Sequence, residues 1–151
     1  MTVTASQALT AVKTRLSTGT TVSSIYWQGD DAPILPDTPE PFAYVVWDNE
    51  GSRGAPVAFG GGAGNNIYRN NAFVSAYVFS PAGEGADIVL GHAESIAGRL
   101  RSYRDTSISC FSADVILIGP GSSISVPGLS SEVNNYQCAV AEVTLYFDQL
   151  G

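Results

Sequence analysis

Charged residues are scarce in this chain of 151 residues, making up 14% of it, whereas about a quarter of an ordinary soluble domain is charged. Basic residues are the scarcer kind: seven Lys and Arg stand against fourteen Asp and Glu, and Lys13 is the single lysine. Capture of a nucleic-acid backbone needs clustered cations that release counterions, and the sequence has no such cluster. The composition therefore argues against nucleic-acid binding, although an acidic surface can still repel DNA.

Low charge combined with many Gly and Ser residues fits two kinds of protein surface. One is a surface that meets other proteins rather than water, and the other is the polar but uncharged surface of a β-rich domain. Composition alone leaves both interpretations open.

Groups that perform catalysis or hold metals are also few. His92 is the only histidine, and no Gly-x-Ser-x-Gly turn occurs. Asp30 and Asp31 are the only adjacent carboxylates, and the prolines around them indicate a solvated turn rather than an acid/base pair. The Gly-rich stretch 59–66 lacks the Lys-Ser/Thr of a phosphate-binding loop, and no residue spacing fits a metal site. We expect no enzymatic activity, no metal and no cofactor.

Cysteines and long apolar runs are rare as well. Cys110 and Cys138 lie in separate strand-like segments, and we expect buried free thiols in a reducing compartment. No apolar run approaches the roughly 20 residues needed to span a bilayer. Residues 1–6 lack the basic and apolar parts of a signal peptide. We therefore expect no signal peptide and no membrane partner.

The pattern of apolar residues predicts one domain over residues 1–151. A first helix follows an N-cap at Thr4 and ends at Gly19, and a second covers 86–103. The first helix is expected to bury Ala5, Leu9, Val12 and Leu16. Strands are predicted over 22–28, 42–47, 67–79, 112–118 and 136–147. The predicted fold is α+β: a mixed, mostly antiparallel sheet of about five strands with two helices packed on one face.

Three segments between these elements are predicted to be loops. Residues 30–41 contain four prolines and are expected to form an extended linker. Residues 48–66 are rich in glycine and 119–131 in Gly, Ser and Pro. Structureless loops this long are uncommon in compact domains and are often functional or mobile.

The central predicted strands are apolar on both faces. In one of them Phe73, Tyr77 and Phe79 point one way, and the alternating residues 74, 76 and 78 point the other. Two helices cover one face only, so the other face needs cover from elsewhere. A neighbouring subunit could supply it, or the long loops could fold back over it, and the sequence leaves both possibilities open.

A few side chains are candidates for contact with partners. Arg69 could pair with acids across an interface or be an ordinary solvated arginine at a strand end. The group Arg99, Arg101 and Arg104 is most simply explained by the preference of cations for a helix C-terminus. The candidate interface residues are Arg53, Phe59, Arg69, Tyr77 and Trp47.

Four features of the chain carry a family resemblance. They are an opening helix with Leu9, Val12 and Leu16, a proline-rich approach to strand 42–45, a strand 72–79 that turns through 80–85 into a helix with Ala93, Ile96 and Leu100, and a closing strand that ends near 145–147. Together they cover nearly the whole chain. In these features the sequence resembles the tail terminator proteins of long-tailed bacteriophages (siphophages) and gene transfer agents.

The resemblance implies a structural role in the virion tail, for a protein made in the host cytoplasm. Members of this family form a hexameric ring that caps the tail tube protein, stops tube polymerisation and presents a surface to the head connector or stopper protein. The genome passes through the ring, and an acidic lumen would repel its phosphates. Two alternatives remain: another head–tail joining or neck protein, or a carbohydrate- or small-molecule-binding domain with Trp27, Tyr44 and Trp47 as an aromatic platform.

Overall fold

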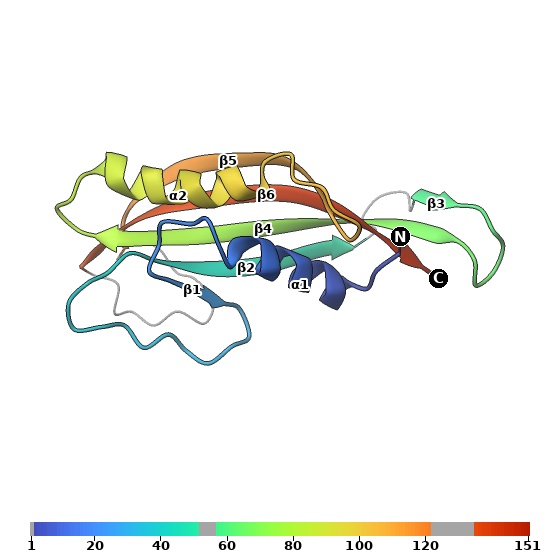
Figure 1. Ribbon diagram of the computed structural model, residues 1–151, viewed down its shortest axis with the longest axis horizontal. Coiled ribbons are helices and arrows are strands. Elements are labelled where there is room, and N and C mark those ends of the chain that lie inside the picture. The colour runs from blue at the N-terminus through green and yellow to red at the C-terminus, as the bar shows by residue number, and fades with distance from the viewer. Residues whose placement is uncertain (1, 52–56, 122–134) are drawn as a thin grey trace.

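The computed structural model describes residues 2–51, 57–121 and 135–151, and side chains are described for these residues except 49–51 and 57–59. The elements in chain order are α1 (Ala5–Leu16), β1 (Ser24–Trp27), β2 (Phe42–Gly51), β3 (Val57–Phe59), β4 (Ile67–Pro81), α2 (Ala86–Leu100), β5 (Ser109–Pro120) and β6 (Tyr136–Leu150). The strands lie in the order β1-β2-β4-β6-β5, and β3 pairs with β4 (Figure 1). Among the described strand pairs, only β1 and β2 are parallel. The predicted α+β fold with a mixed sheet is confirmed.

Helix α1 begins where the sequence predicted, because its capping box forms. The backbone N–H of Gln7 donates to Thr4 Oγ1 (3.2 Å), and the N–H of Thr4 donates to Gln7 Oε1 (2.8 Å). The buried stripe of α1 consists of Ala8, Val12 and Leu16. The predicted Ala5 and Leu9 are only partly buried. Residues 8, 12 and 16 are spaced by four, so they lie on one face, and Leu9 is turned partly out of it.

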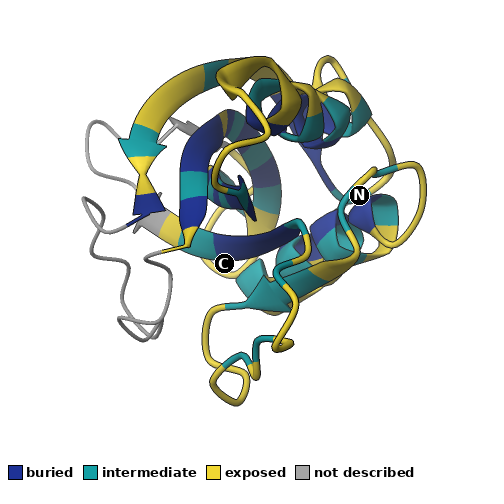
Figure 2. Ribbon diagram, turned by 90° about the vertical axis from the view of Figure 1, so that its left-hand side faces the viewer, coloured by how far each residue is buried: buried dark blue, intermediate teal, exposed yellow. Residues whose placement is uncertain are grey.

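Both helices pack on the same face of the sheet. Helix α2 buries the apolar stripe Val89, Ala93, Ile96, Ala97 and Leu100. The face of the sheet beneath the helices contains small residues, which let the helices approach closely. Among them are Ala43, Ala72, Ala76, Ala139 and Ala141. Figure 2 looks along the strands and shows the sheet curving around the helix side, with buried residues concentrated where helices and strands face each other.

Strands β4 and β6 are longer than their apolar alternation indicated. Their register runs from Ile67 opposite Leu150 to Pro81 opposite Tyr136, so the two strands pair along their whole length. The predicted end of β6 at residue 147 is therefore wrong by three residues. Backbone hydrogen bonds to β4 extend β6 through polar residues that carry no periodic signal.

The predicted loop over 48–66 is wrong in part. Strand β2 continues to Gly51, and the three residues of β3 pair with residues 67–69 of β4. A strand this short has too little alternation to be read from sequence, and it exists because β4 offers it a partner. Most of the other predicted loop, 119–131, lies outside the described residues.

The second helix also ends earlier than predicted. Arg101 has an extended backbone (φ −57°, ψ 120°) and Ser102 has φ 56°, so α2 stops at Leu100 rather than at residue 103. Strand β5 begins at Ser109, three residues before its predicted start at 112. The turn between them brings the C-terminal end of α2 beside the start of β5.

The outer face of the sheet, opposite the helices, is covered at one end by the chain itself. Phe42, Tyr44, Phe79, Tyr136 and Cys138 are buried there, and Tyr26, Leu35, Val46 and Tyr77 pack against them. Leu35 belongs to the proline-rich segment that the sequence predicted as a linker. At this aromatic end, therefore, a loop does fold back and no neighbouring subunit is needed.

Candidate functional site

The edge strand β5 carries the most continuous exposed apolar surface. Within the described residues β5 pairs only with β6 and with the bridge at Arg104, so no described strand pairs with its outer edge at residues 111–119. Its side chains at 111, 116, 117 and 118 are large, apolar and exposed, with Ile116 at 47%. An open apolar edge is a template for pairing with another chain unless it is protected. Two register shifts in β5 disturb its ladder, which is one form of such protection.

A hollow of about 330 Å³ on the outer face is acidic. Asp48, Asp114 and Glu142 line it together with Phe73, Ser75, Ser112 and Thr144, and we call it the acidic hollow. Asp114 on β5 stands directly opposite Glu142 on β6, and like charges so placed destabilise a sheet. In the described part of the chain no group of three His, Cys or carboxylate side chains is arranged to hold a metal. This surface is suited to repelling anions.

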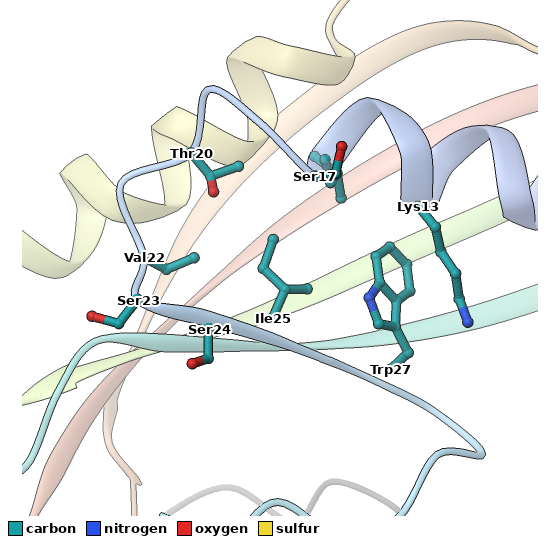
Figure 3. A pocket seen from close by; sticks show the side chains of 9 residues that line it. Lys13, Ser17, Thr20, Val22, Ser23, Ser24, Ile25 and Trp27 are labelled. Atoms are coloured by element: carbon teal, nitrogen blue, oxygen red, sulfur yellow. The ribbon is translucent and has the colours of Figure 1, made fainter. Parts of the chain in front are cut away.

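A second hollow, of about 300 Å³, lies between α1 and β1 (Figure 3). Lys13 from the helix and Trp27 from the strand lie side by side there, with the ammonium 5.3 Å from the ring centroid. The rest of the lining is Ile25, Val22, Leu16 and the hydroxyls of Ser17, Thr20, Ser23 and Ser24. None of the lining residues is a carboxylate, a thiol or an imidazole.

The aromatic platform suggested by the sequence does not form. Trp27 and Trp47 lie on the helix side of the sheet, where Trp47 is 6.3 Å from the ring of Phe147. Tyr44 lies on the outer face and is only 3% exposed. Tyr44 and Trp47 are three residues apart in one strand, and an odd spacing places side chains on opposite faces. The carbohydrate-platform alternative is therefore wrong for these residues.

The predicted interface residues are spread over several places. Arg53 lies outside the described residues, and Phe59 lies in β3, where side chains are not described. Trp47 is half-buried on the helix side, and Tyr77 is half-buried against the aromatic cluster of the outer face. Trp47 and Tyr77 thus lie on opposite faces of the sheet.

Arg69 has a partner within its own chain. Its Nε and Nη2 donate to the two carboxylate oxygens of Asp148 at 2.9 and 3.0 Å, and its guanidinium stacks 4.0 Å from the ring centroid of Tyr146. The hydrogen bonds from Arg69 lower the pKa of Asp148. Arg69 is thus more than a solvated strand-end arginine, and its pairing with acids across an interface stays a prediction.

Tyr146 sits at the centre of a polar cluster on the same face. Arg104 Nη2 donates to its hydroxyl at 2.9 Å, and the ring of Phe111 lies 4.8 Å away. The pKa of the Tyr146 phenol is lowered, first by a hydrogen bond with Ser109 and to a smaller extent by the charges of Arg104 and Arg69. Arg104 therefore does more than favour a helix end, since it joins the turn after α2 to β6.

The other two arginines of that group also make specific contacts. Arg101 donates to the carbonyl oxygen of Ala113 at 2.7 Å and pairs with Glu94 at 3.4 Å. Arg99 Nη2 donates to the carbonyl oxygen of Arg15 at 3.2 Å, and Arg15 Nε donates to that of Arg99 at 2.8 Å. The helix-end explanation is incomplete, because these bonds connect α2 to β5 and to α1.

Arg15 and Arg99 border the largest of these hollows, about 400 Å³, which we call the arginine hollow. It is lined by Gln7, Thr10, Ala11, Thr14, Arg15, Arg99, Tyr103, Asp105 and Ser107. The guanidinium of Arg15 lies 4.2 Å from the ring centroid of Tyr103. Neither arginine forms an ion pair within the ranges that the structure describes. No sequence pattern indicates this hollow, because its two arginines are 84 positions apart.

Gly19 allows this arrangement. Its φ of +79° is disfavoured for other residues, and a Cβ at this position would lie 2.8 Å from Cδ and Nε of Arg99. Arg99 Nε is buried and has no hydrogen-bond partner among the described residues. Another residue here would strain the backbone after α1 and would require the Arg99 side chain to move.

The thiols and the histidine form no catalytic arrangement in the described structure. Cys110 and Cys138 are buried and free, as predicted, and burial raises their pKa values to about 11 and about 12. His92 Nδ1 hydrogen-bonds with Thr21 Oγ1 at 2.7 Å, which ties α2 to the segment before β1. These contacts are structural.

Comparison with protein-family models and with curated proteins found no match for this chain. No helix among the described residues is long and apolar enough to cross a membrane.

Proposed function

We propose that this protein is a ring-forming structural subunit of a phage-type tail, a tail terminator that caps the tail tube and stops its polymerisation. Six copies would form the ring, with one face on the tube protein and the other on the head connector. The observation that carries the proposal is the open β5 edge, whose exposed Ile116, Leu117 and Ile118 have no cover within the described residues. An uncovered apolar edge strand favours assembly with another protein chain.

The acidic surface is consistent with the proposed channel. The chain has a net charge of −7, and the acidic hollow brings Asp48, Asp114 and Glu142 to the outer face of the sheet. In a ring, such a surface beside the channel would repel the phosphates of passing DNA and limit its adhesion. The resemblance noted in the sequence supports the same role.

The test uses tubes assembled from the tail tube protein of the same genome, with and without this protein. We expect the natural chain to give tubes of limited length with a ring at one end, seen by electron microscopy. Ile116→Lys should leave the ends bare, since it places a charge on the β5 edge. Ile88→Lys is the matched control, because Ile88 is similarly exposed (41%) but lies on α2.

Three outcomes would contradict the proposal. Tubes that outgrow their normal length in the presence of the natural chain, with no ring at their ends, exclude a terminator. A ring that binds the head connector without limiting tube length indicates a joining or neck protein instead. Hydrolytic turnover that disappears in His92→Ala would overturn the structural role altogether. Under the structural role, assembly should not depend on the His92 side chain.

A further inference from the structure

One segment of this chain carries acidic residues and no basic ones. Residues 17–52 contain six Asp and Glu and no Lys or Arg. Within them the loop 28–41, which we call the acidic loop, carries Asp30, Asp31, Asp37 and Glu40, all exposed. None of these four forms an ion pair among the residues that the structure describes. The loop therefore presents carboxylates that are unsatisfied by its own chain.

The acidic loop also exposes one apolar side chain from a backbone that is held in place. Ile34 is 89% exposed, the highest value for a large apolar residue in the described chain. Its neighbour Leu35 points the other way and packs against the aromatic cluster. Pro33 and Pro36 flank the pair and restrict the backbone. An anchored loop that holds out one apolar side chain between carboxylates loses little freedom on binding.

The arginine hollow has the complementary character. Arg15 and Arg99 bring two guanidiniums without an ion-pair partner in the described structure, although acids outnumber bases two to one. Asp105, the one carboxylate of the lining, already accepts hydrogen bonds from the backbone N–H groups of Ser107 and Ile108 and from the Tyr103 hydroxyl. The ring of Tyr103 and the methyl group of Ala11 are the apolar part of the lining.

We propose that the acidic loop of one copy docks into the arginine hollow of the next copy, with Ile34 against Tyr103 and the carboxylates toward Arg15 and Arg99. In Figure 1 the loop lies below β1, while the end of α2 and the turn that follows it lie above α1. The two surfaces are different parts of the molecule, so the contact is heterologous and closes only as a ring or propagates as a filament.

A second copy is the partner that the charges favour. Copies with a net charge of −7 repel one another unless their contact pairs opposite charges. Each copy carries both halves of this pairing, one acidic and one basic. The inference rests on the proposed ring-forming role, for which it names a contact between neighbouring copies that is separate from the β5 edge.

Cysteine cross-linking of the purified protein at high concentration tests the contact. Thr14→Cys marks the hollow, and Ile34→Cys marks the loop. Cys110 and Cys138 give little background, because both are buried. We expect a mixture of the two single variants to give a disulfide-linked dimer on oxidation, and a chain with both changes to give a ladder that ends at a closed ring. Ile88→Cys, also exposed, is the control and should not link to Ile34→Cys.

Charge variants test the electrostatic part. The triple change Asp30→Lys, Asp31→Lys and Asp37→Lys should abolish the cross-link between positions 14 and 34. The matched triple change in the acidic hollow, Asp48→Lys, Asp114→Lys and Glu142→Lys, alters net charge equally and should preserve it. Added salt should lower the cross-link yield, since the pairs are near the surface.

Each result decides the inference. Absence of the 14–34 cross-link, equal linking of position 34 to position 88, or an unchanged yield in the loop triple variant would overturn it. If tubes are capped by rings but this cross-link is absent, the contact is wrong and the proposed function stands. If the closed ladder forms but tubes are never capped, the contact stands and the proposed function fails.

Discussion

The outer face of the sheet has two ends that are held together in different ways. At the aromatic end Phe42 stacks on Phe79 with ring centroids 4.8 Å apart, and Tyr136 meets both edge-on. At the polar end Phe73 is exposed, three carboxylates share the acidic hollow, and Arg69 pairs with Asp148. The same strands, β4 and β6, run through both ends.

This difference separates what the chain covers by itself from what it leaves for other molecules. The proline-rich loop closes the aromatic end through Leu35, so the aromatics there are part of the monomer core. At the polar end and along β5, apolar side chains stay exposed among the described residues. A sheet that is apolar on both faces is thus covered over part of its outer face by its own chain, as far as the described residues show.

The largest effect is expected from a change at the aromatic end. Phe79→Ala removes a fully buried ring and should lower the free energy of unfolding by about 3 to 5 kcal/mol. Phe73→Ala, on the same strand and face but 37% exposed, should cost less than about 1 kcal/mol. Urea unfolding of both variants measures the contrast. Equal losses would show that the two ends are equally packed.

Adjacent residues of the acidic loop offer a finer comparison. Leu35→Ala removes apolar contact with the aromatic cluster and should cost about 1 to 2 kcal/mol, less than a fully buried leucine. Ile34→Ala should change the stability of the monomer by less than about 0.5 kcal/mol, because its side chain is in solvent. Thermal or urea unfolding at low protein concentration gives both values. A costly Ile34→Ala change would mean that Ile34 packs in the monomer.

At the polar end, the ion pair of Asp148 predicts a dependence on pH. Its pKa is lowered in the folded state, so the pair contributes stability above the ordinary carboxyl pKa of about 4 and loses it as the pH falls through the folded value. Because both side chains are partly exposed, we expect no more than about 1 kcal/mol. Asp148→Asn should be less stable than the natural chain at pH 7, and the difference should vanish in acid. A difference that grows in acid would contradict the assignment.

The smallest effect is expected where two carboxylates oppose each other. Asp114→Asn removes the repulsion from Glu142 and should raise stability by about 0.5 kcal/mol at low salt, and by less at high salt. Asp30→Asn, in the exposed loop, should be neutral and serves as the control. Unfolding at two ionic strengths provides the measurement. A loss of stability in Asp114→Asn would indicate that this carboxylate has a favourable partner.

Local patterns in the sequence determined much of the fold. The capping box of Thr4 and Gln7, the helical spacing from Val89 to Leu100 and the alternation in β6 all involve residues a few positions apart. Their physical causes, a cap hydrogen bond and one-sided burial, act within one element. For this reason the α+β class, both helices and the five longer predicted strands were predictable, although the ends of several elements were not.

Tertiary structure alone decided which distant residues meet. Local patterns do not connect the segments that meet in three places. These are the pairing of β3 with β4, the packing of Leu35 on the outer face, and the hydrogen bonds between Arg15 and Arg99. The packing of Trp27 against the same helix-side core as Trp47 was settled in the same way, because the two residues lie in different strands. Such contacts depend on how whole elements pack, and a short strand, a loop or a lone arginine carries no periodic signal that reveals its partner.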